Sequence, residues 1–437
     1  MSEKLMENQM DQPMTRRGFL KTTAVTCAAI GAPVIFTGCK TVQYPADDCL
    51  IKSVQGGAAL SGKKIFEEAS FGPIPVKNRL VRSATSFHAT DEYGRPTQKL
   101  LDIYSELGQG GVGTIITGMT DTGLLLDNET FREQDMEAHR KVPERIHSYG
   151  AAAIQQLSHR GSQLETASDE DLFSINRLSD LEIEQIIERF VKNIERSRRM
   201  GFDGVQLHGA HGYLLSEFLS PAMNRRTDKW GGSTENRFRI VNEIIKRSKQ
   251  KQGAFPVFIK INAYDFQKKG MREPESINIA KLLEKAGCDG IEVSCGVARD
   301  GFSTLRVTEI PMDAITAFGP FKDASRLTKF FVSTFGPFAV GLYTPLFNYN
   351  VCAAAEIKKQ VTIPVMVVGG IRTRGDMEAI VQHDLADFVA LSRPLIIEPG
   401  IVNSLKDKSQ TESECINCGY CLIGHYSRDV HCYYGKV

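Results

Sequence analysis

Two histidines and a tyrosine stand in the order His208-Gly-Ala-His211-Gly-Tyr213, directly after the short apolar run Gly204 to Leu207. Such a run, preceded by a helix-like segment, is typical of a buried strand. The three side chains are therefore expected just past the carboxyl end of a strand, where parallel α/β folds build their sites. Imidazole N–H groups can hold an oxygen that gains negative charge, and a phenol can hand over a proton. The spacing predicts a catalytic group.

The motif continues far beyond these three residues. From His208 to Arg237 the chain reads HGAHGYLLSEFLSPAMNRRTDKWGGSTENR. This stretch resembles the Old Yellow Enzyme and 2,4-dienoyl-CoA reductase family of NADH:flavin oxidoreductases, which are FMN-binding barrels. The resemblance covers roughly Ser61 to Gly400. It implies that His208 and His211 bind the activating oxygen of the substrate and that Tyr213 is the proton donor.

Strand-like runs alternate with helix-like segments along the same stretch, which predicts a closed (β/α)8 TIM barrel. The helices are expected at Leu181–Met200, Ser276–Ala286 and Asp376–Gln382, and Gly62 to Lys77 should form a hairpin under the barrel. The eight expected strands, buried on both faces, are Asn78–Ser83, Thr114–Thr117, Ala152–Leu157, Gly204–Leu207, Val257–Ile261, Gly290–Ser294, Val365–Val368 and Phe388–Leu391.

The resemblance also implies an FMN site at the strand ends. Ala84 and Thr85 depart from the family pattern after the first strand, and Ser86 then takes the place of a residue near the flavin carbonyl. Gly118 ends the second strand, where the backbone must approach the isoalloxazine closely.

Further residues complete the expected FMN site. The resemblance implies that Gln156 hydrogen-bonds the pyrimidine ring and that Lys260 stabilises negative charge on the reduced flavin. The phosphate is expected in the loops after strands seven and eight, at Gly369-Gly370 and Ser392-Arg393, because that is the standard phosphate site of such barrels. Arg393 would contact it in bidentate fashion.

The N-terminus resembles an export signal. Thr15 to Lys21 reads TRRGFLK, a twin-arginine pattern, and a mildly apolar stretch leads to Phe36-Thr37-Gly38-Cys39, which is similar to a lipoprotein signal-peptidase site. We expect a signal peptide over 1–39, a tether over 40–60, the FMN-binding barrel over 61–408 and a cysteine-rich tail over 409–437. The expected location is the periplasm, with a lipid anchor at Cys39 favoured over plain cleavage nearby; an ordinary basic amphipathic N-terminus is the alternative to an export signal.

The tail carries thiols at cluster-like spacing. Cys415-x2-Cys418-x2-Cys421 is followed by Cys432. This pattern favours a [4Fe–4S] cluster, with a zinc site and plain thiols or disulfides as alternatives. The dienoyl-CoA reductase branch places four cluster ligands immediately after its barrel, but with one more residue in two of the gaps. Elsewhere, Cys288, Cys295 and Cys352 are interpreted as core residues, and Cys49 has no evident role.

One long connection interrupts the barrel pattern. Between Cys295 and about Asn348 no strand is evident, so this stretch is interpreted as a lid or binding loop. A surface insertion is the alternative. Its aromatic residues are expected to pack over cofactor or substrate, namely Phe330, Phe331, Phe335, Phe338 and Tyr343.

Net charge and chain length limit the partners and electron donors that we expect. With 53 basic and 52 acidic side chains the net charge is +1, so no nucleic-acid partner is implied. The chain ends at Val437 without a strand-linked dinucleotide fingerprint, so we expect electrons from a membrane or cytochrome partner rather than from an appended domain. The expected reaction is reduction of an activated C=C bond in an enone or enoate. An amine dehydrogenase resembling trimethylamine dehydrogenase, direct reduction by NAD(P)H, and a carrier without a substrate are the alternatives.

Overall fold

A computed structural model of the chain describes residues 41–43, 49–56, 60–122, 133–164, 173–298, 302–424 and 429–436. The twin-arginine motif and Cys39 lie outside the described residues. Within the described ranges no helix combines the length and apolarity needed to cross a bilayer.

Eight parallel strands close into a barrel. β5 pairs with both β4 and β7, which joins the two ends of the sheet, and a short strand β6 (Thr120–Asp121) extends the edge of β7. The predicted (β/α)8 TIM barrel is therefore confirmed. The barrel strands are β4 (Leu80–Arg82), β5 (Thr114–Ile116), β7 (Ala152–Ser158), β8 (Gly204–Gly209), β9 (Val257–Tyr264), β10 (Gly290–Cys295), β12 (Val365–Val368) and β13 (Phe388–Leu391).

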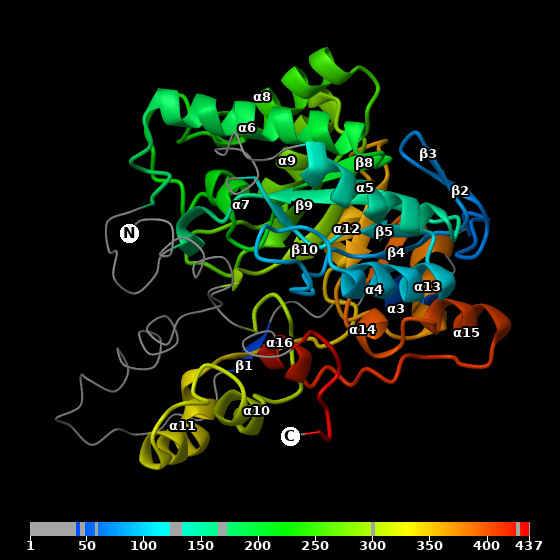
Figure 1. Cartoon of the computed structure of the whole chain (residues 1–437), viewed down its shortest axis with the longest axis vertical. Helices are drawn as coiled ribbons and strands as arrows, with labels where there is room; N and C mark the ends of the chain where they lie inside the picture. Colours follow the sequence, from blue (N-terminus) through cyan, green and yellow to red (C-terminus); the bar gives the residue numbers. More distant parts are fainter. Residues whose placement is uncertain are drawn as a thin grey trace.

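Helices form the outer layer around these strands (Figure 1). α6 shows why: a capping box of Ser179 and Glu182 begins it, and an apolar stripe that includes Ile183, Ile187 and Phe190 faces the strands. The helices of this layer are α4 (Gln98–Gln109), α5 (Glu133–His147), α6 (Asp180–Arg199), α8 (Thr234–Gln252), α9 (Glu273–Ala286), α12 (Val351–Lys358), α13 (Arg374–Gln382), α14 (Pro394–Ile397) and α15 (Ile401–Asp407).

An antiparallel hairpin closes the amino-terminal end of the barrel, as predicted. It consists of β2 (Ala69–Phe71) and β3 (Ile74–Val76). The fully buried ring of Phe71 stacks on Phe258 of β9 at a centroid distance of 4.2 Å and meets Phe388 of β13 at 5.0 Å. This apolar floor leaves the opposite, carboxyl end of the barrel for polar side chains.

The segment predicted to be a tether is in part folded onto the barrel, which corrects the interpretation of residues 40–60. β1 (Thr41–Gln43) pairs in parallel with β11 (Leu342–Thr344), and α3 (Cys49–Gln55) contacts α12 and α13. A disulfide joins Cys49 to Cys352 of α12. Cys49 therefore has a role that the sequence did not indicate, and Cys352 is not simply a core thiol.

The long connection after β10 folds into a small subdomain and is not a plain loop. It contains α10 (Met312–Ala317), α11 (Arg326–Ala339) and β11, and it shares a small apolar core with α16 (Tyr420–Gly424) of the tail. In Figure 1 these elements lie together at one end of the molecule. The expectation that its phenylalanines cover a cofactor is wrong for three of them, since Phe330, Phe331 and Phe335 are exposed at the surface of α11.

Candidate functional site

The predicted catalytic residues meet at the carboxyl end of the barrel. His208 is the penultimate residue of β8, and Tyr213 caps the short helix α7 (Leu214–Leu219) that follows. The His208 ring lies 4.5 Å from the Tyr213 ring and 5.1 Å from the His211 ring, centroid to centroid. The structure therefore brings together all three side chains.

The turn between β8 and α7 is held by its neighbours. His211 has a positive φ of 63°, a conformation that a non-glycine residue adopts only when its surroundings impose it. Its backbone N–H donates to Asn262 Oδ1 at 3.2 Å, and its Nε2 hydrogen-bonds Ser294 Oγ at 2.7 Å. β9 and β10 thus fix the orientation of an imidazole that β8 presents.

Both imidazoles are held neutral. Burial and, to a smaller extent, the nearby positive charge of Lys260 lower the pKa of His211 to about 3. Burial also lowers the pKa of His208 well below its usual range, assisted by His211 and Lys260. In the described part of the chain no group hydrogen-bonds the buried Nδ1 of His208. A neutral imidazole of this kind can donate an N–H to a ligand oxygen.

The phenol of Tyr213 keeps its proton. Burial raises the pKa of Tyr213, and Asp121 raises it further while Arg160 opposes the shift. Asp121 and Arg160 pair with each other at 3.4 Å, at the ends of β6 and β7. A protonated phenol beside two neutral imidazoles can serve as a general acid at neutral pH.

A buried polar network lies in the barrel beneath these rings. Glu292 of β10 accepts hydrogen bonds from Ser83 (2.7 Å) and Gln206 (2.7 Å) and pairs with Lys260 at 3.2 Å. Lys260 also donates to Ser83 at 2.9 Å, and Gln156 donates to Gln206 at 2.7 Å. Gln156 and Lys260, predicted separately as flavin ligands, therefore belong to one network.

Sequence reasoning missed three members of this network, Ser83, Gln206 and Glu292. A signal was present for two of them, because Gln206 and Glu292 interrupt otherwise apolar strands. A carboxylate that is fully buried must be paired, so such a residue in a barrel strand points inward to a site.

The predicted residues after β4, β5 and β13 also lie together. A Cβ on Gly118 would sit 2.9 Å from the carbonyl oxygen of Thr85 and 3.1 Å from the Cα of Ser86, so only glycine fits there. Thr85 Oγ1 lies 3.0 Å from Ser392 Oγ, and Ala84, like Ser86, is half-buried. These strand ends form one side of the same rim.

The predicted phosphate residues converge on the loop that precedes α12. Gly369 and Gly370 have φ values of 140° and 72°, and a Cβ on Gly370 would lie 2.4 Å from the carbonyl oxygen of Leu346. The buried guanidinium of Arg393 donates to the carbonyl oxygen of Arg306 at 2.9 Å. Arg306, itself 1% exposed, is a second buried cation that the sequence did not reveal.

Comparison with known proteins decides the family. Residues 64–298 match the model of the NADH:flavin oxidoreductase / NADH oxidase family. The chain belongs to this family. It is therefore an FMN-dependent oxidoreductase, and the predicted resemblance is confirmed. The NADH oxidase of Thermoanaerobacter brockii is 33% identical over 386 residues, which are 82% of this chain but only 53% of that protein.

Solved structures show the same fold. A 2-naphthoyl-CoA reductase in complex with 2-naphthoyl-CoA matches with a TM-score of 0.67 and 21% identity, over 84% of this chain and 56% of its own. Histamine dehydrogenase from Rhizobium sp. 4-9 matches with a TM-score of 0.62 and 21% identity, over 79% and 48%. The chain thus spans about half the length of each of these proteins.

The residues at the rim fit the FMN that this family binds. The Nε of Arg306 is buried and has no hydrogen-bond partner among the described residues. Arg306 is also the residue whose carbonyl oxygen accepts the hydrogen bond from Arg393. Buried guanidinium groups with spare donors suit a phosphate. Lys260 uses two of its three donors within the network, on Ser83 and Glu292, at the level of the barrel where the flavin ring is expected.

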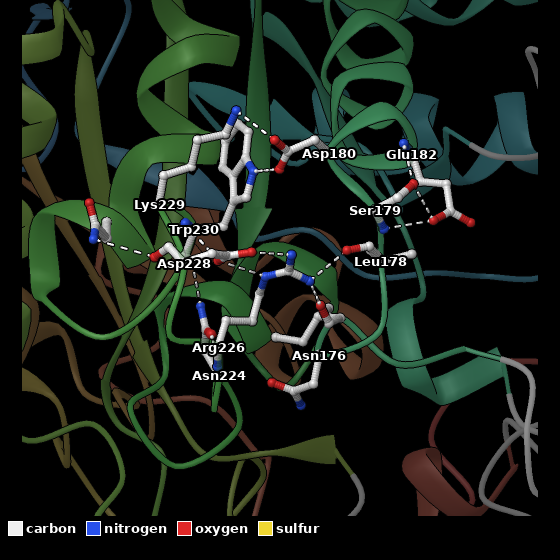
Figure 2. Close-up of polar contacts among 12 residues, drawn as sticks. Asn176, Leu178, Ser179, Asp180, Glu182, Asn224, Arg226, Asp228, Lys229 and Trp230 are labelled. Carbon is white, nitrogen blue, oxygen red and sulfur yellow. Dashed lines mark hydrogen bonds and ion pairs between the residues drawn. The ribbon is translucent and has the colours of Figure 1, made fainter.

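The second half of the family motif is structural. Arg226 donates to the carbonyl oxygens of Ile175 (2.6 Å) and Leu178 (2.8 Å). Figure 2 shows the contact with Leu178 and the pairing of the guanidinium with Asp228. In the same view the indole of Trp230 donates to Asp180 at 2.7 Å. These contacts tie the segment before α6 to the turn between α7 and α8, and so support the helix that Tyr213 caps.

The four tail cysteines are free thiols that influence one another. Burial, opposed by Arg393 and reinforced by the other three cysteines, raises the pKa of Cys421 to about 11. Arg372 donates to the carbonyl oxygen of Cys415 at 3.1 Å. In the described ranges no three cysteine, histidine or carboxylate side chains are arranged as a metal site, so the predicted cluster is not confirmed.

Proposed function

We propose that this protein reduces a C=C bond conjugated to a carbonyl group, as in an enone or enoate. The observation that carries the proposal is the grouping of two neutral imidazoles and one protonated phenol at the carboxyl end of the barrel. Two N–H donors suit a carbonyl oxygen that becomes an enolate, and a phenol suits the carbon that must be protonated.

Each residue then has a defined part. His208 and His211 would bind the carbonyl oxygen and polarise the alkene. Tyr213 would deliver its phenolic proton to one alkene carbon. FMN, when bound, supplies the hydride for the other carbon. Lys260, which lies opposite His208 in the register of β8 and β9, would hold positive charge beneath the flavin.

Oxidation of an amine is the second candidate, because histamine dehydrogenase shares the fold. At 21% identity this likeness concerns the fold alone. The donor set favours the first candidate, since a protonated amine offers no acceptor for imidazole N–H groups.

An anaerobic titration separates the two candidates. The purified flavoprotein is reduced with dithionite and mixed with cyclohexenone, or the oxidised protein is mixed with histamine or trimethylamine. We expect the enone to reoxidise the flavin and the amines to leave it oxidised. Flavin reduction by an amine, with no reoxidation by enones or enoates, would overturn the proposal.

We further propose that the tail binds an iron–sulfur cluster through Cys415, Cys418, Cys421 and Cys432. The thiol set is that of a [4Fe–4S] cluster, which would supply one-electron transfer. The surroundings support this, because two nitrogens of the buried Arg82 guanidinium have no hydrogen-bond partner among the described residues. Burial lowers the pKa of Arg82 to about 10, and its neighbours Tyr104 and Cys421 oppose that shift. Iron and acid-labile sulfide should each be present in protein purified without oxygen; a metal-free or zinc-only protein would contradict this part.

The N-terminal motifs extend the proposal to location. We propose export by the twin-arginine route, lipid attachment at Cys39, and reduction by a membrane-bound or cytochrome donor, because NAD(P)H is not maintained outside the cytoplasm. The disulfide between Cys49 and Cys352 supports export, since disulfides persist in oxidising compartments. R16K/R17K should leave the protein in the cytoplasm of a bacterial host. Fast reduction of the flavin by NADPH, at a rate that C418S does not change, would contradict the proposed electron donor.

A further inference from the structure

The surface of α11 is the least explained part of the molecule. Leu327, Phe330 and Phe331 are 66%, 61% and 50% exposed, and their i, i+3, i+4 spacing places them on one helical face. Phe335, one turn further, is 39% exposed and stacks at 5.9 Å on Phe331. Single exposed apolar residues are ordinary, but a face of this kind marks an interaction site.

The opposite face of the same helix is firmly packed. Val332 packs against the small core that α10 and α16 share, and a Cβ on Gly336 would lie 2.6 Å from the methyl carbon of Met312. α11 therefore cannot turn its phenylalanines inward without breaking this core. The exposed face is a fixed feature of the fold.

The approach to this face carries a net positive charge. Lys322, Arg326 and Lys329 lie before or within the first turn of α11 and outnumber Asp323, and α11 itself contains no acidic residue. A helix with aromatic and leucine side chains on one face and basic residues beside it is typical of a helix that lies in the surface of an anionic membrane. With 14 residues α11 is too short to cross a bilayer.

The chain itself leads from α11 to the proposed lipid anchor. α11 ends three residues before Leu342, and Leu342 is the partner of Thr41 in the β1–β11 pair. Cys39 stands two residues before Thr41. The strand pair therefore holds the start of β1, which follows Cys39 by two residues in the sequence, beside the segment that follows α11.

We propose that α11 is a membrane-docking helix, with Leu327, Phe330 and Phe331 inserted into the headgroup region of an anionic bilayer. The inference deepens the proposed anchoring at Cys39, since one lipid attachment and one interfacial helix together hold a protein in a fixed orientation. α16 packs in the same core as α11, and Tyr420 of α16 donates to Asp313 of α10 at 2.6 Å. Docking would thus hold the cysteine tail close to the membrane, where the proposed donor resides.

Fluorescence tests the insertion at the helix itself. The only native tryptophan, Trp230, is 1% exposed and serves as an internal baseline. F331W adds an indole on the docking face, and L181W adds one at a still more exposed position on α6. Both are made in the full flavin-loaded chain carrying C39A, so that no lipid can be attached. Vesicles contain phosphatidylethanolamine and phosphatidylglycerol with brominated acyl chains.

We expect the F331W indole to shift to the blue and lose most of its emission, while L181W and the baseline stay unchanged. Because both variants share the same N-terminus, membrane binding by the signal segment cannot produce this difference. L327S, F330S and F331S should each weaken vesicle binding by roughly tenfold. Lys329→Glu should weaken it on anionic vesicles only.

Three outcomes would overturn the inference. The F331W emission could stay unchanged with vesicles; it could be quenched equally in L181W; or it could shift with protein concentration when vesicles are absent, which would assign the face to a second copy of the chain. Metabolic labelling of the wild type with a radioactive fatty acid separates this from the anchoring proposal. Label without insertion refutes the docking helix alone, and insertion without label refutes only the anchor.

Discussion

Cys49 and Cys352 are joined by a disulfide across 303 positions of sequence, with their Cα atoms 5.4 Å apart. The bond fixes α3 to α12, and α3 follows the strand β1 that pairs with β11. One covalent link thus holds the N-terminal segment of β1 and α3 on the barrel, next to the small subdomain that contains α11.

This bond should stabilise the protein markedly. Removing a native disulfide typically costs about 2–5 kcal/mol, because the cross-link restricts the unfolded chain. C49S/C352S should therefore lower the apparent melting temperature of the flavin-loaded protein. Dithiothreitol should lower it equally in the wild type and have no further effect in the double variant. C288S, which removes a buried free thiol, should keep the sensitivity to dithiothreitol. Equal melting with and without reductant would show that the bond does not form.

Replacing Tyr213 tests the proton donor. Tyr213→Phe removes the hydroxyl while keeping the ring that lies 4.5 Å from the His208 ring. We expect reoxidation of the reduced flavin by an enone to slow by roughly 10²- to 10⁴-fold, the usual contribution of a general acid. Reduction of the flavin by dithionite should not change. Stopped-flow absorbance measures both steps, and Tyr93→Phe, at an exposed position, is the matched control. Unchanged reoxidation in Tyr213→Phe would place the acid elsewhere.

The two imidazoles are tested by binding of a phenol to the oxidised flavoprotein, which a long-wavelength charge-transfer band reports. H208A/H211A should abolish the band, because both oxygen donors are lost. Ser294→Ala should only weaken binding, since it removes the 2.7 Å contact that orients His211 but not the imidazole itself. Tight phenol binding in the double variant would refute the assignment of the oxygen site.

The sequence predicted the barrel well because each strand is a short apolar run between helical patterns. The observed strand Phe388–Leu391 coincides with the expected one, whereas Asn78–Ser83 shortens to Leu80–Arg82. The pairing of cysteines that lie far apart in the chain could not be predicted from the sequence. Nothing in the spacing of ten cysteines links Cys49 to Cys352, since connectivity cannot be deduced from spacing alone.

The site divides in the same way. His208, His211 and Tyr213 were found because they stand close together in one motif. Glu292 was missed because it is a single carboxylate in a different strand, and only the register of the paired strands β9 and β10 brings it to Lys260. The aromatic content of α11 was noticed, but composition does not tell which side of a helix faces the solvent.

Acid should destabilise the protein through its buried histidines. The folded-state pKa of His211, about 3, lies below the ordinary value of 6.5. Between pH 3 and pH 6.5 the unfolded chain therefore binds a proton at this residue, whereas the folded chain does not. Stability is therefore present above about pH 6.5 and is lost progressively as the pH falls toward 3. The melting temperature of H208A/H211A should fall less over this window than that of the wild type. Phenol binding should show no titration near pH 6.5, and a midpoint there would contradict the neutral, buried state.

The Lys260–Glu292 pair should be more important to stability than any surface pair. Both side chains are buried, and Glu292 also accepts from Ser83 and Gln206. Glu292→Gln would leave the Lys260 ammonium buried without its counter-charge, which typically costs about 3–5 kcal/mol in the free energy of unfolding. K260M/E292Q should recover part of this loss, because no lone charge remains. The exposed pair Lys359–Glu356, at 2.6 Å, is the control, and Glu356→Gln should cost less than about 1 kcal/mol. Urea unfolding at saturating FMN measures all four proteins. Equal losses in Glu292→Gln and Glu356→Gln would mean that the network does not hold the barrel together.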